Sequence, residues 1–423
     1  MNTRKHPSLS PWLIWGLACA FFFFEFMVRV APSGMLRYLM ESFTLSAAGI
    51  GFVNACYFYV FAPAQIPIGP LMDRYGARRL VFWGSVLMTF GCLIFATAYG
   101  GILAATGRIF MGLGSSVGFV AVVYISSHWF AKERLAFLVG MANSIGMLGA
   151  VIGQGPTSLI TESFGWRSSF FLYLILGVFL TILIGMYLKN DPNNPLPTDS
   201  SPSKDALGHF VSVAKSPLTW LNGVAGSLFY SVTSVFAGLW GIDFLSEVHG
   251  IKNSSAAFGI SLIFVGWMIG GPVMGKLADY WQKEKTILWI TPLGALCCLL
   301  PILYTEALHV WALYPLLLLL GFFSSAQILN YTISIELHDP SSKGTVIAIT
   351  NFVVMMGSSF MQPLVGFLLD SNWSGQMDGL LRVYTKDAWL IATSVFPIAL
   401  FLTFLINLLM PKKGHQHNPE VSF

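Results

Sequence analysis

Long apolar stretches follow one another along the chain and are separated by short polar segments. A helix needs about 20 mostly apolar residues to cross the hydrocarbon core of a bilayer. The stretches that meet this length cover residues 12–38, 46–72, 80–98, 101–130, 135–160, 168–188, 218–245, 254–278, 286–304, 310–336, 345–369 and 388–410. The pattern predicts an all-α membrane protein with twelve transmembrane helices.

The polar segment between the sixth and seventh stretches is the longest. Residues 189–217 are rich in Pro, Asn, Ser and Asp, a composition that cannot bury a core and is typical of a flexible linker. We therefore expect two six-helix bundles, at residues 1–188 and 218–410. A cytoplasmic linker over 189–217 would join them, and a cytoplasmic tail over 411–423 would follow.

Composition and loop charge agree with this arrangement. Hydrophobic residues make up 55% of the chain and charged residues only 10%, whereas an ordinary soluble domain has about 25% charged residues. If the N-terminus lies in the cytoplasm, most of the 23 Lys and Arg residues fall on the cytoplasmic side, as the positive-inside rule requires. We expect a multi-pass membrane protein with both termini in the cytoplasm and no nucleic-acid partner.

The two halves of the chain carry related sequences at corresponding places. Gly69-Pro-Leu-Met-Asp73 closes the second stretch, and Gly275-Lys-Leu-Ala-Asp279 closes the eighth. Internal duplication of a six-helix unit is typical of transporters.

The loop between the second and third stretches carries the most specific signal. Gly69-Pro-Leu-Met-Asp73-Arg74-Tyr-Gly76-Ala-Arg78-Arg79 matches every position of the pattern Gly-x-x-x-Asp-Arg-x-Gly-x-Arg-Arg. On these residues the chain resembles the major facilitator superfamily, and the resemblance covers essentially the whole chain. It implies two pseudo-symmetric six-helix bundles that move a solute by alternating access.

The same resemblance implies a gating role for the loop motif and its repeat. In the superfamily the motif's Asp faces the cytoplasmic start of the eleventh helix, and the partial positive charge of a helix N-terminus attracts an anion. Asp73 would therefore hold the bundles together at the cytoplasmic side, and Asp279 would do so toward the fifth helix. Gly69 would allow close helix approach and Gly76 a tight turn. The alternative is a solvated loop whose arginines only set topology. The predicted gating residues are Gly69, Asp73, Arg74, Gly76, Arg78, Gly275 and Asp279.

Two opposite charges lie inside the first apolar stretch. Glu25 and Arg29 are four residues apart, so both lie on one face of a helix, one turn apart. An ion at that depth costs about 3 kcal/mol on insertion scales and rarely persists without a use or a partner. The pair could be permanent and structural, or it could bind protons and substrate. Glu25 is the best proton-carrier candidate, because it is the only carboxylate expected deep in the membrane.

Further polar residues could complete a central site. Arg108 lies about two turns inside the fourth stretch, where it could serve substrate or proton movement or extend to the membrane interface. The remaining candidates lie on helices that border the cavity in the superfamily, although each alone could be a contact between helices. The predicted proton-coupling residues are Glu25, Arg29 and Arg108, and the predicted substrate-binding residues are Glu25, Arg29, Asn54, Tyr57, Arg108, Asn143, Tyr230, Trp267, Gln327, Asn330 and Asn351.

A closer resemblance concerns the first two stretches. Phe-Glu25-Phe-Met-Val-Arg29-Val-Ala-Pro32-Ser, followed by Tyr57-Phe-Tyr59 and Ala62-Pro-Ala-Gln65-Ile-Pro67-Ile-Gly, is similar to the phagosomal-transporter family of intracellular bacteria. Members of that family import amino acids or nucleosides, and a relative handles siderophores. The resemblance implies a protein of the bacterial inner membrane.

We therefore predict a secondary active transporter, a monomer, for proton-coupled uptake of an amino acid or a similar small polar nutrient. The alternatives are an exporter of a siderophore, drug or metabolite, a nucleoside importer, and a non-transporting membrane sensor. No loop of the type Gly-x-x-x-x-Gly-Lys-Ser/Thr occurs, so ATP is not expected to drive transport. The eight His residues are scattered, and we predict no metal site, no cofactor and no enzymatic activity.

Overall fold

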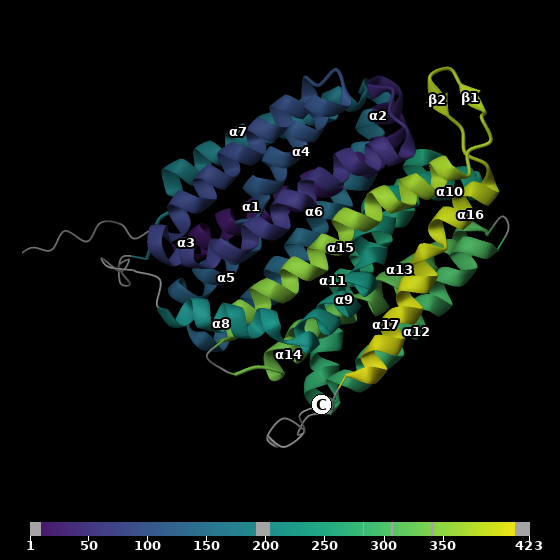
Figure 1. Cartoon of the computed structure of the whole chain (residues 1–423). Coiled ribbons are helices and arrows are strands. Elements are labelled where there is room, and N and C mark those ends of the chain that lie inside the picture. Colours follow the sequence, from purple (N-terminus) through teal and green to yellow (C-terminus); the bar gives the residue numbers. More distant parts are fainter. Residues whose placement is uncertain (1–9, 192–203, 282, 306–307, 340–341, 411–423) are drawn as a thin grey trace, which may run out of the picture.

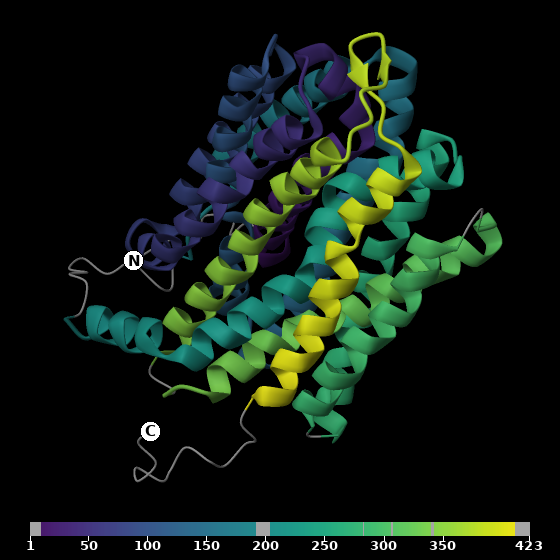
Figure 2. The same cartoon turned by 45° about the vertical axis from the view of Figure 1, so that its right-hand side comes forward.

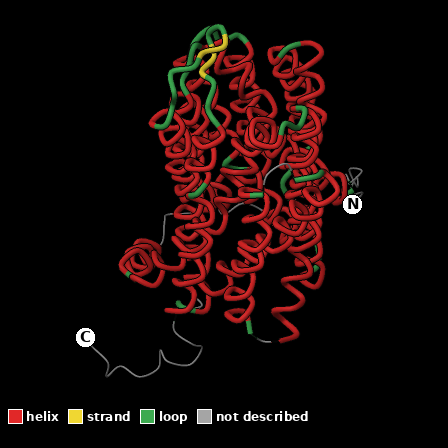
Figure 3. The backbone as a smooth tube through the Cα atoms, turned by 90° about the vertical axis from the view of Figure 1, so that its right-hand side faces the viewer, coloured by secondary structure: helices red, strands yellow, loops and turns green. Residues whose placement is uncertain are grey.

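The computed structural model describes residues 10–191, 204–281, 283–305, 308–339 and 342–410. The predicted tail over 411–423, the first nine residues of the predicted N-terminal bundle and residues 192–203 of the predicted linker lie outside the described residues. Almost all of the described chain is helical, and long helices run side by side through the body of the molecule (Figure 3).

The first half of the chain forms one six-helix bundle (Figure 1). Its elements are α1 (Pro11–Val30), the 3-10 helix η1 (Ala31–Met35), α2 (Leu36–Phe43), α3 (Ala47–Ala96), α4 (Gly101–Ser115), α5 (Gly118–Trp129), η2 (Lys132–Arg134), α6 (Leu135–Phe164) and α7 (Trp166–Tyr187). The 50-residue α3 contains two predicted spans. They are separated by an interruption of the helical backbone at Gly76, with φ 77° and ψ 159°. Only glycine adopts such a conformation without strain.

The second half forms the other bundle. Its elements are α9 (Pro217–Ser231), the π-helix η3 (Val232–Trp240), α10 (Gly241–His249), α11 (Asn253–Trp281), α12 (Glu284–Tyr304), α13 (Val310–Ser324), η4 (Ser325–Ile328), α14 (Leu329–Glu336), α15 (Lys343–Ser371), α16 (Lys386–Thr393) and α17 (Val395–Leu409). Within the described ranges, eleven helical segments are long and apolar enough to cross a membrane. Since α3 holds two of the predicted spans, the predicted fold with twelve transmembrane helices is confirmed.

An antiparallel hairpin of β1 (Met377–Asp378) and β2 (Leu381–Arg382) marks one end of the molecule (Figure 2). We call this the outer end and the opposite end the inner end, following the orientation predicted from loop charge. The predicted linker contains a helix, α8 (Lys204–Lys215), whose Val213 packs against Val346 and Ile349 of α15. The polar composition of this segment did not indicate that contact.

The first, fourth, seventh, tenth and twelfth spans are not continuous α-helices. They are interrupted by η1, by the turn before Gly118, by η3, by η4 and by the turn at Ser394 respectively. An interruption leaves backbone groups without partners inside the helix, and at membrane depth this is tolerated only where protein or a water-filled cavity covers them. We therefore expect protein or a water-filled cavity to cover each of these interruptions.

Two pairs of helices join the bundles: α3 packs against α15, and α6 packs against α11 (Figure 1). In the first pair, a Cβ atom on Gly51 would lie 2.8 Å from the Gln362 carbonyl oxygen, and one on Gly366 would collide with the Ala47 carbonyl oxygen. The outer halves of α3 and α15 thus approach as closely as their backbones allow.

Glycines also set the packing inside the first bundle, and this gives a first prediction. A Cβ atom on Gly149 of α6 would collide with the Phe23 carbonyl oxygen of α1, whereas one on Gly140 of the same helix would meet no atom within 4 Å. Overpacking a tight contact costs about 1–3 kcal/mol. We expect Gly149→Ala to lower the thermal unfolding midpoint of the purified protein by several degrees. Gly140→Ala should leave it unchanged or raise it, and equal midpoints for both variants would contradict the packing described.

Candidate functional site

Glu25 and Arg29 form a buried ion pair in the first bundle. Arg29 Nη2 donates to Glu25 Oε1, and only 1% of Glu25 and 6% of Arg29 is exposed. Both residues lie on α1, four residues apart, as the sequence predicts. Two buried opposite charges offset each other's loss of hydration, but removing either one leaves the other uncompensated.

Aromatic rings enclose the Arg29 guanidinium. Its Cζ lies 4.4 Å from the ring centre of Phe26 and 4.7 Å from that of Phe61, and Nε donates to the Tyr57 hydroxyl at 3.3 Å. Contacts between a cation and aromatic faces stabilise the charge where water is excluded. Arg29 is therefore held as a cation independently of its ion pair with Glu25.

The second carboxylate oxygen of Glu25 has no hydrogen-bond partner among the described residues. It lies against Gly118, the first residue of α5, where a Cβ atom would collide with Oε2. A buried carboxylate oxygen without a donor is costly. The cost falls if the oxygen carries a proton or if water reaches it.

Arg108 is fully buried and holds the end of α1. It donates to the carbonyl oxygens of Val28 and Arg29, both at 3.1 Å, and its Cζ lies 4.7 Å from the ring centre of Tyr57. These carbonyls belong to the last turn of α1 before η1, where carbonyl groups lack partners inside the helix. In this arrangement Arg108 positions the backbone that carries the ion pair.

A small cavity lies between the bundles beside the ion pair. Arg29 lines it, and Glu25 lies behind Arg29, outside the lining. The other lining residues are Phe26, Val30, Phe58, Tyr230, Thr233, Ser234, Gly238, Phe264 and Gln362. The cavity therefore combines one cation, several hydroxyl and amide groups and aromatic walls.

The remaining predicted binding residues fall into three groups. Asn54 and Asn351 bridge the bundles, since Asn54 Nδ2 donates to Gln362 Oε1 at 2.8 Å and Asn351 donates to Gln65. Trp267 supports the cavity from behind, where its ring lies edge-on to Tyr230 and its Nε1 donates to Thr233 at 2.7 Å. The third group also lies outside the cavity lining, as Asn54, Asn351 and Trp267 do, and consists of Asn143, which is half-buried on α6, Gln327, which is buried at η4, and Asn330, which donates to Asn222 within the second bundle.

One amide that was not among the predicted site residues links the cavity to both bundles. Gln362 accepts the bond from Asn54 and donates through Nε2 to the Ser234 carbonyl oxygen at 3.1 Å. That carbonyl belongs to the π-helix η3, a form that occurs mostly as short segments at functional sites. An isolated buried amide in the eleventh span was the available signal, whereas the π-helix left no mark in the hydropathy pattern.

The predicted gating residues lie at the inner end. Gly76 forms the turn, where an added Cβ atom would collide with the Asn190 side chain. Arg78 donates from its backbone to Asn190 at 3.0 Å, and the Arg74 guanidinium lies over Tyr75. Asp73 and Asp279 are exposed, and no ion pair of the described residues includes Asp73. Cβ atoms on Gly69 and Gly275 would meet open space, so the close approach expected at Gly69 is not present in this arrangement.

The fold and the central charged cavity define a membrane transporter. The chain belongs to the Major Facilitator Superfamily, whose sequence pattern matches residues 16–362. No group of three or more His, Cys, Asp or Glu side chains converges on a metal position in the described ranges.

The chain is also similar to named relatives and to solved structures. It is similar to the hexuronate transporter of Bacillus subtilis (strain 168), 22% identical over 88% of this chain and 83% of the relative. It is also similar to a probable sulfoacetate transporter of Cupriavidus necator, 20% identical over 69% of this chain and 72% of the relative. A bacterial homologue of the human lysosomal transporter Spinster has the same fold, with a TM-score of 0.74, 14% identity and coverage of 96% of this chain and 98% of that one.

The two hydrogen bonds from Arg108 give a second prediction. Lysine carries one compact ammonium group and cannot reproduce the planar fork that reaches two carbonyl oxygens. Hydrogen bonds to a charged group contribute about 1.5–3 kcal/mol. We expect Arg108→Lys to lower the thermal unfolding midpoint by several degrees. Arg167→Lys, at an exposed arginine that donates to a single carbonyl, is the matched control and should change it little.

Proposed function

We propose that the protein is a proton-coupled transporter that takes up a small solute bearing a carboxylate, with amino acids as the favoured class. The observation that carries this proposal is the position of Arg29, which contacts Glu25 on one side and lines the cavity on the other. A carboxylate that enters the cavity would compete with Glu25 for the same guanidinium. Arg29 would therefore bind the substrate, while Glu25 would take the proton.

Charge balance in the site would couple substrate binding to protonation of Glu25. With the cavity empty, Arg29 and Glu25 neutralise each other. A bound carboxylate adds a second negative charge beside a buried Glu25 that already has one oxygen without a donor, and like charges in one site favour protonation of one of them. Substrate binding and protonation of Glu25 would thus favour each other, which is the condition for symport.

The hydroxyl and amide groups of the cavity would receive the rest of the substrate. Ser234, Thr233 and Gln362 lie on the wall formed by the second bundle, where they could accept hydrogen bonds from an ammonium group. The hexuronate and sulfoacetate transporters among the relatives are named for organic acids, which supports a cationic binding group such as Arg29. A contact between the substrate's ammonium group and Glu25 is less favoured, because Glu25 does not line the cavity.

The membrane location, the orientation and the oligomeric state that we propose are those predicted from the sequence. We infer a bacterial inner-membrane protein with cytoplasmic termini that works as a monomer, and a place within the amino acid or nucleoside phagosomal-transporter group. The bundles would alternate around the cavity, with the Asp73 latch at the inner end closed in the outward-open state. The exposed Asp73 described above agrees with a state in which that latch is open.

The third prediction tests the coupling. We would measure uptake of labelled amino acids, dicarboxylates and nucleosides into proteoliposomes, with and without an inward acid gradient. The expected result is gradient-driven accumulation of a carboxylate-bearing solute. In Glu25→Gln, accumulation should be lost while exchange of internal for external substrate is retained, because the carrier can no longer release a proton.

Glu41→Gln is the matched control, since Glu41 is an exposed carboxylate on α2, and it should accumulate substrate like the parent chain. Uptake of a nucleoside alone would contradict the assignment of Arg29 as a carboxylate-binding group. Accumulation that persists in Glu25→Gln would make the buried ion pair purely structural.

A further inference from the structure

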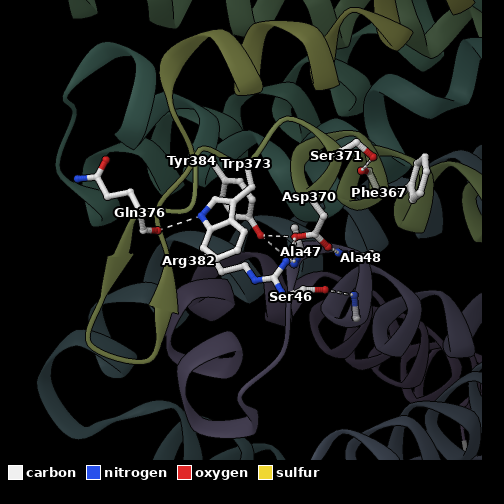
Figure 4. Close-up of polar contacts among 11 residues, drawn as sticks. Ser46, Ala47, Ala48, Phe367, Asp370, Ser371, Trp373, Gln376, Arg382 and Tyr384 are labelled. Carbon is white, nitrogen blue, oxygen red and sulfur yellow. Dashed lines mark hydrogen bonds and ion pairs between the residues drawn. The ribbon is translucent and has the colours of Figure 1, made fainter.

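Asp370, near the end of α15 in the second bundle, receives hydrogen bonds from the start of α3 in the first bundle (Figure 4). Its Oδ2 accepts from the Ala48 backbone N–H at 2.8 Å, and its Oδ1 accepts from the Ala47 backbone N–H at 3.3 Å. The same Oδ1 accepts from the Tyr384 hydroxyl at 2.6 Å and from Arg382 Nη1 at 3.1 Å.

The contact completes the capping of α3. The first backbone N–H groups of a helix have no partner inside it. The side chain of Ser46 accepts from Gly49 at 3.3 Å, as an N-cap residue does. The N–H groups of Ala47 and Ala48 are left to Asp370, and Ala47 also donates to the Tyr384 hydroxyl at 3.1 Å. A carboxylate at this position also benefits from the helix dipole.

The second bundle holds this carboxylate in place. Arg382 pairs with Asp370, and its Cζ lies 4.4 Å from the ring centre of Trp373, while Tyr384 is almost fully buried. Contacts within the second bundle therefore hold Asp370 in the orientation that faces α3. Its side chain is 15% exposed.

Other ionic contacts between the bundles at the outer end are more exposed. Arg37 pairs with Glu247 at 2.6 Å with side-chain exposures of 43% and 25%, and Lys252 pairs with Glu162 at 3.4 Å with exposures of 74% and 18%. Exposed ion pairs contribute little. The Asp370 contact, with its two backbone donors and close backbone packing at Gly366, is the strongest candidate for holding the outer end closed.

We propose that Asp370 is an outer latch, and that it opposes the predicted inner latch of Asp73 on the same two helices. Asp370 ends the eleventh span and caps the start of the second, whereas Asp73 ends the second span and would cap the start of the eleventh. Rocking that brings one pair of ends together separates the other, so one latch opens as the other closes. This inference rests on the alternating access of the proposed function.

The fourth prediction measures opening of the outer end. Met40 is 5% exposed and lines a second cavity, at the outer end, together with Trp240 and Leu369 of the other bundle. A cysteine at this position, Met40→Cys, should react with a membrane-impermeant maleimide only when the bundles separate there. Adding Asp370→Asn should raise the labelling rate about tenfold, since charge-assisted bonds are roughly twice as strong as neutral ones. The parent chain with its native cysteines gives the background.

Three controls separate a latch from a general loss of stability. Ala47→Pro removes one donor without touching Asp370, and proline is tolerated at the first position of a helix, so it should raise labelling by a smaller factor. Lys252→Gln, which breaks only the exposed ion pair, should change nothing. Asp73→Asn should lower the labelling rate, because it weakens the opposite latch.

An unchanged labelling rate in Asp370→Asn, with the protein folded, would overturn the proposal, even if its thermal unfolding midpoint falls. An unchanged rate in Ala47→Pro would do the same if Asp370→Asn fails to fold. The assay needs no substrate, so it stays independent of the coupling assigned to Glu25. If the labelling rates change as predicted but no proton-driven uptake is found, only the proposed substrate and coupling would be wrong.

Discussion

The buried ion pair of Glu25 and Arg29 is the constraint around which the centre of the molecule is arranged. Two charges inside a membrane protein must be compensated on every side, not only by each other. The Tyr57 hydroxyl and the rings of Phe26 and Phe61 contact the Arg29 guanidinium. Arg108 binds carbonyl groups of the α1 backbone that carries both charges. The first, second and fourth spans are thereby tied to a single electrostatic centre.

Contacts between the bundles differ in kind from the centre to the outer end. Near the cavity they are neutral amide bonds, as between Asn54 and Gln362, or from Gln154 to the Ala237 carbonyl. Water can replace such bonds at small net cost when the bundles separate. At the outer end, the carboxylate of Asp370 meets a helix terminus and backbone packs on backbone. The contacts between the bundles are thus easily exchanged for water beside the cavity and depend on a closer geometric fit at the outer end.

The sequence alone was sufficient for the fold, because a bilayer requires each span to satisfy its own backbone hydrogen bonds and so leaves a strong apolar signal. From their four-residue spacing it also indicated that Glu25 and Arg29 could pair, as they do. It could not place Arg108, whose partners are carbonyl groups freed where α1 ends. It singled out Gln327 and Asn330 and passed over Gln362, although of these three only Gln362 lines the cavity. The pattern of side chains along the sequence does not indicate where an α-helix gives way to a 3-10 helix or a π-helix.

The contact between Asp370 and α3 has an evolutionary consequence. Its donors at Ala47 and Ala48 are main-chain groups, which every residue except proline provides. Substitutions on the α3 side therefore leave the donors in place, and sequence drift there would be silent as long as the side chains stay small enough for Gly366 to approach. On the α15 side, the contact depends on the side chain of one residue, Asp370. Selection would act on one residue, so homologues could gain or lose this contact in a single mutational step.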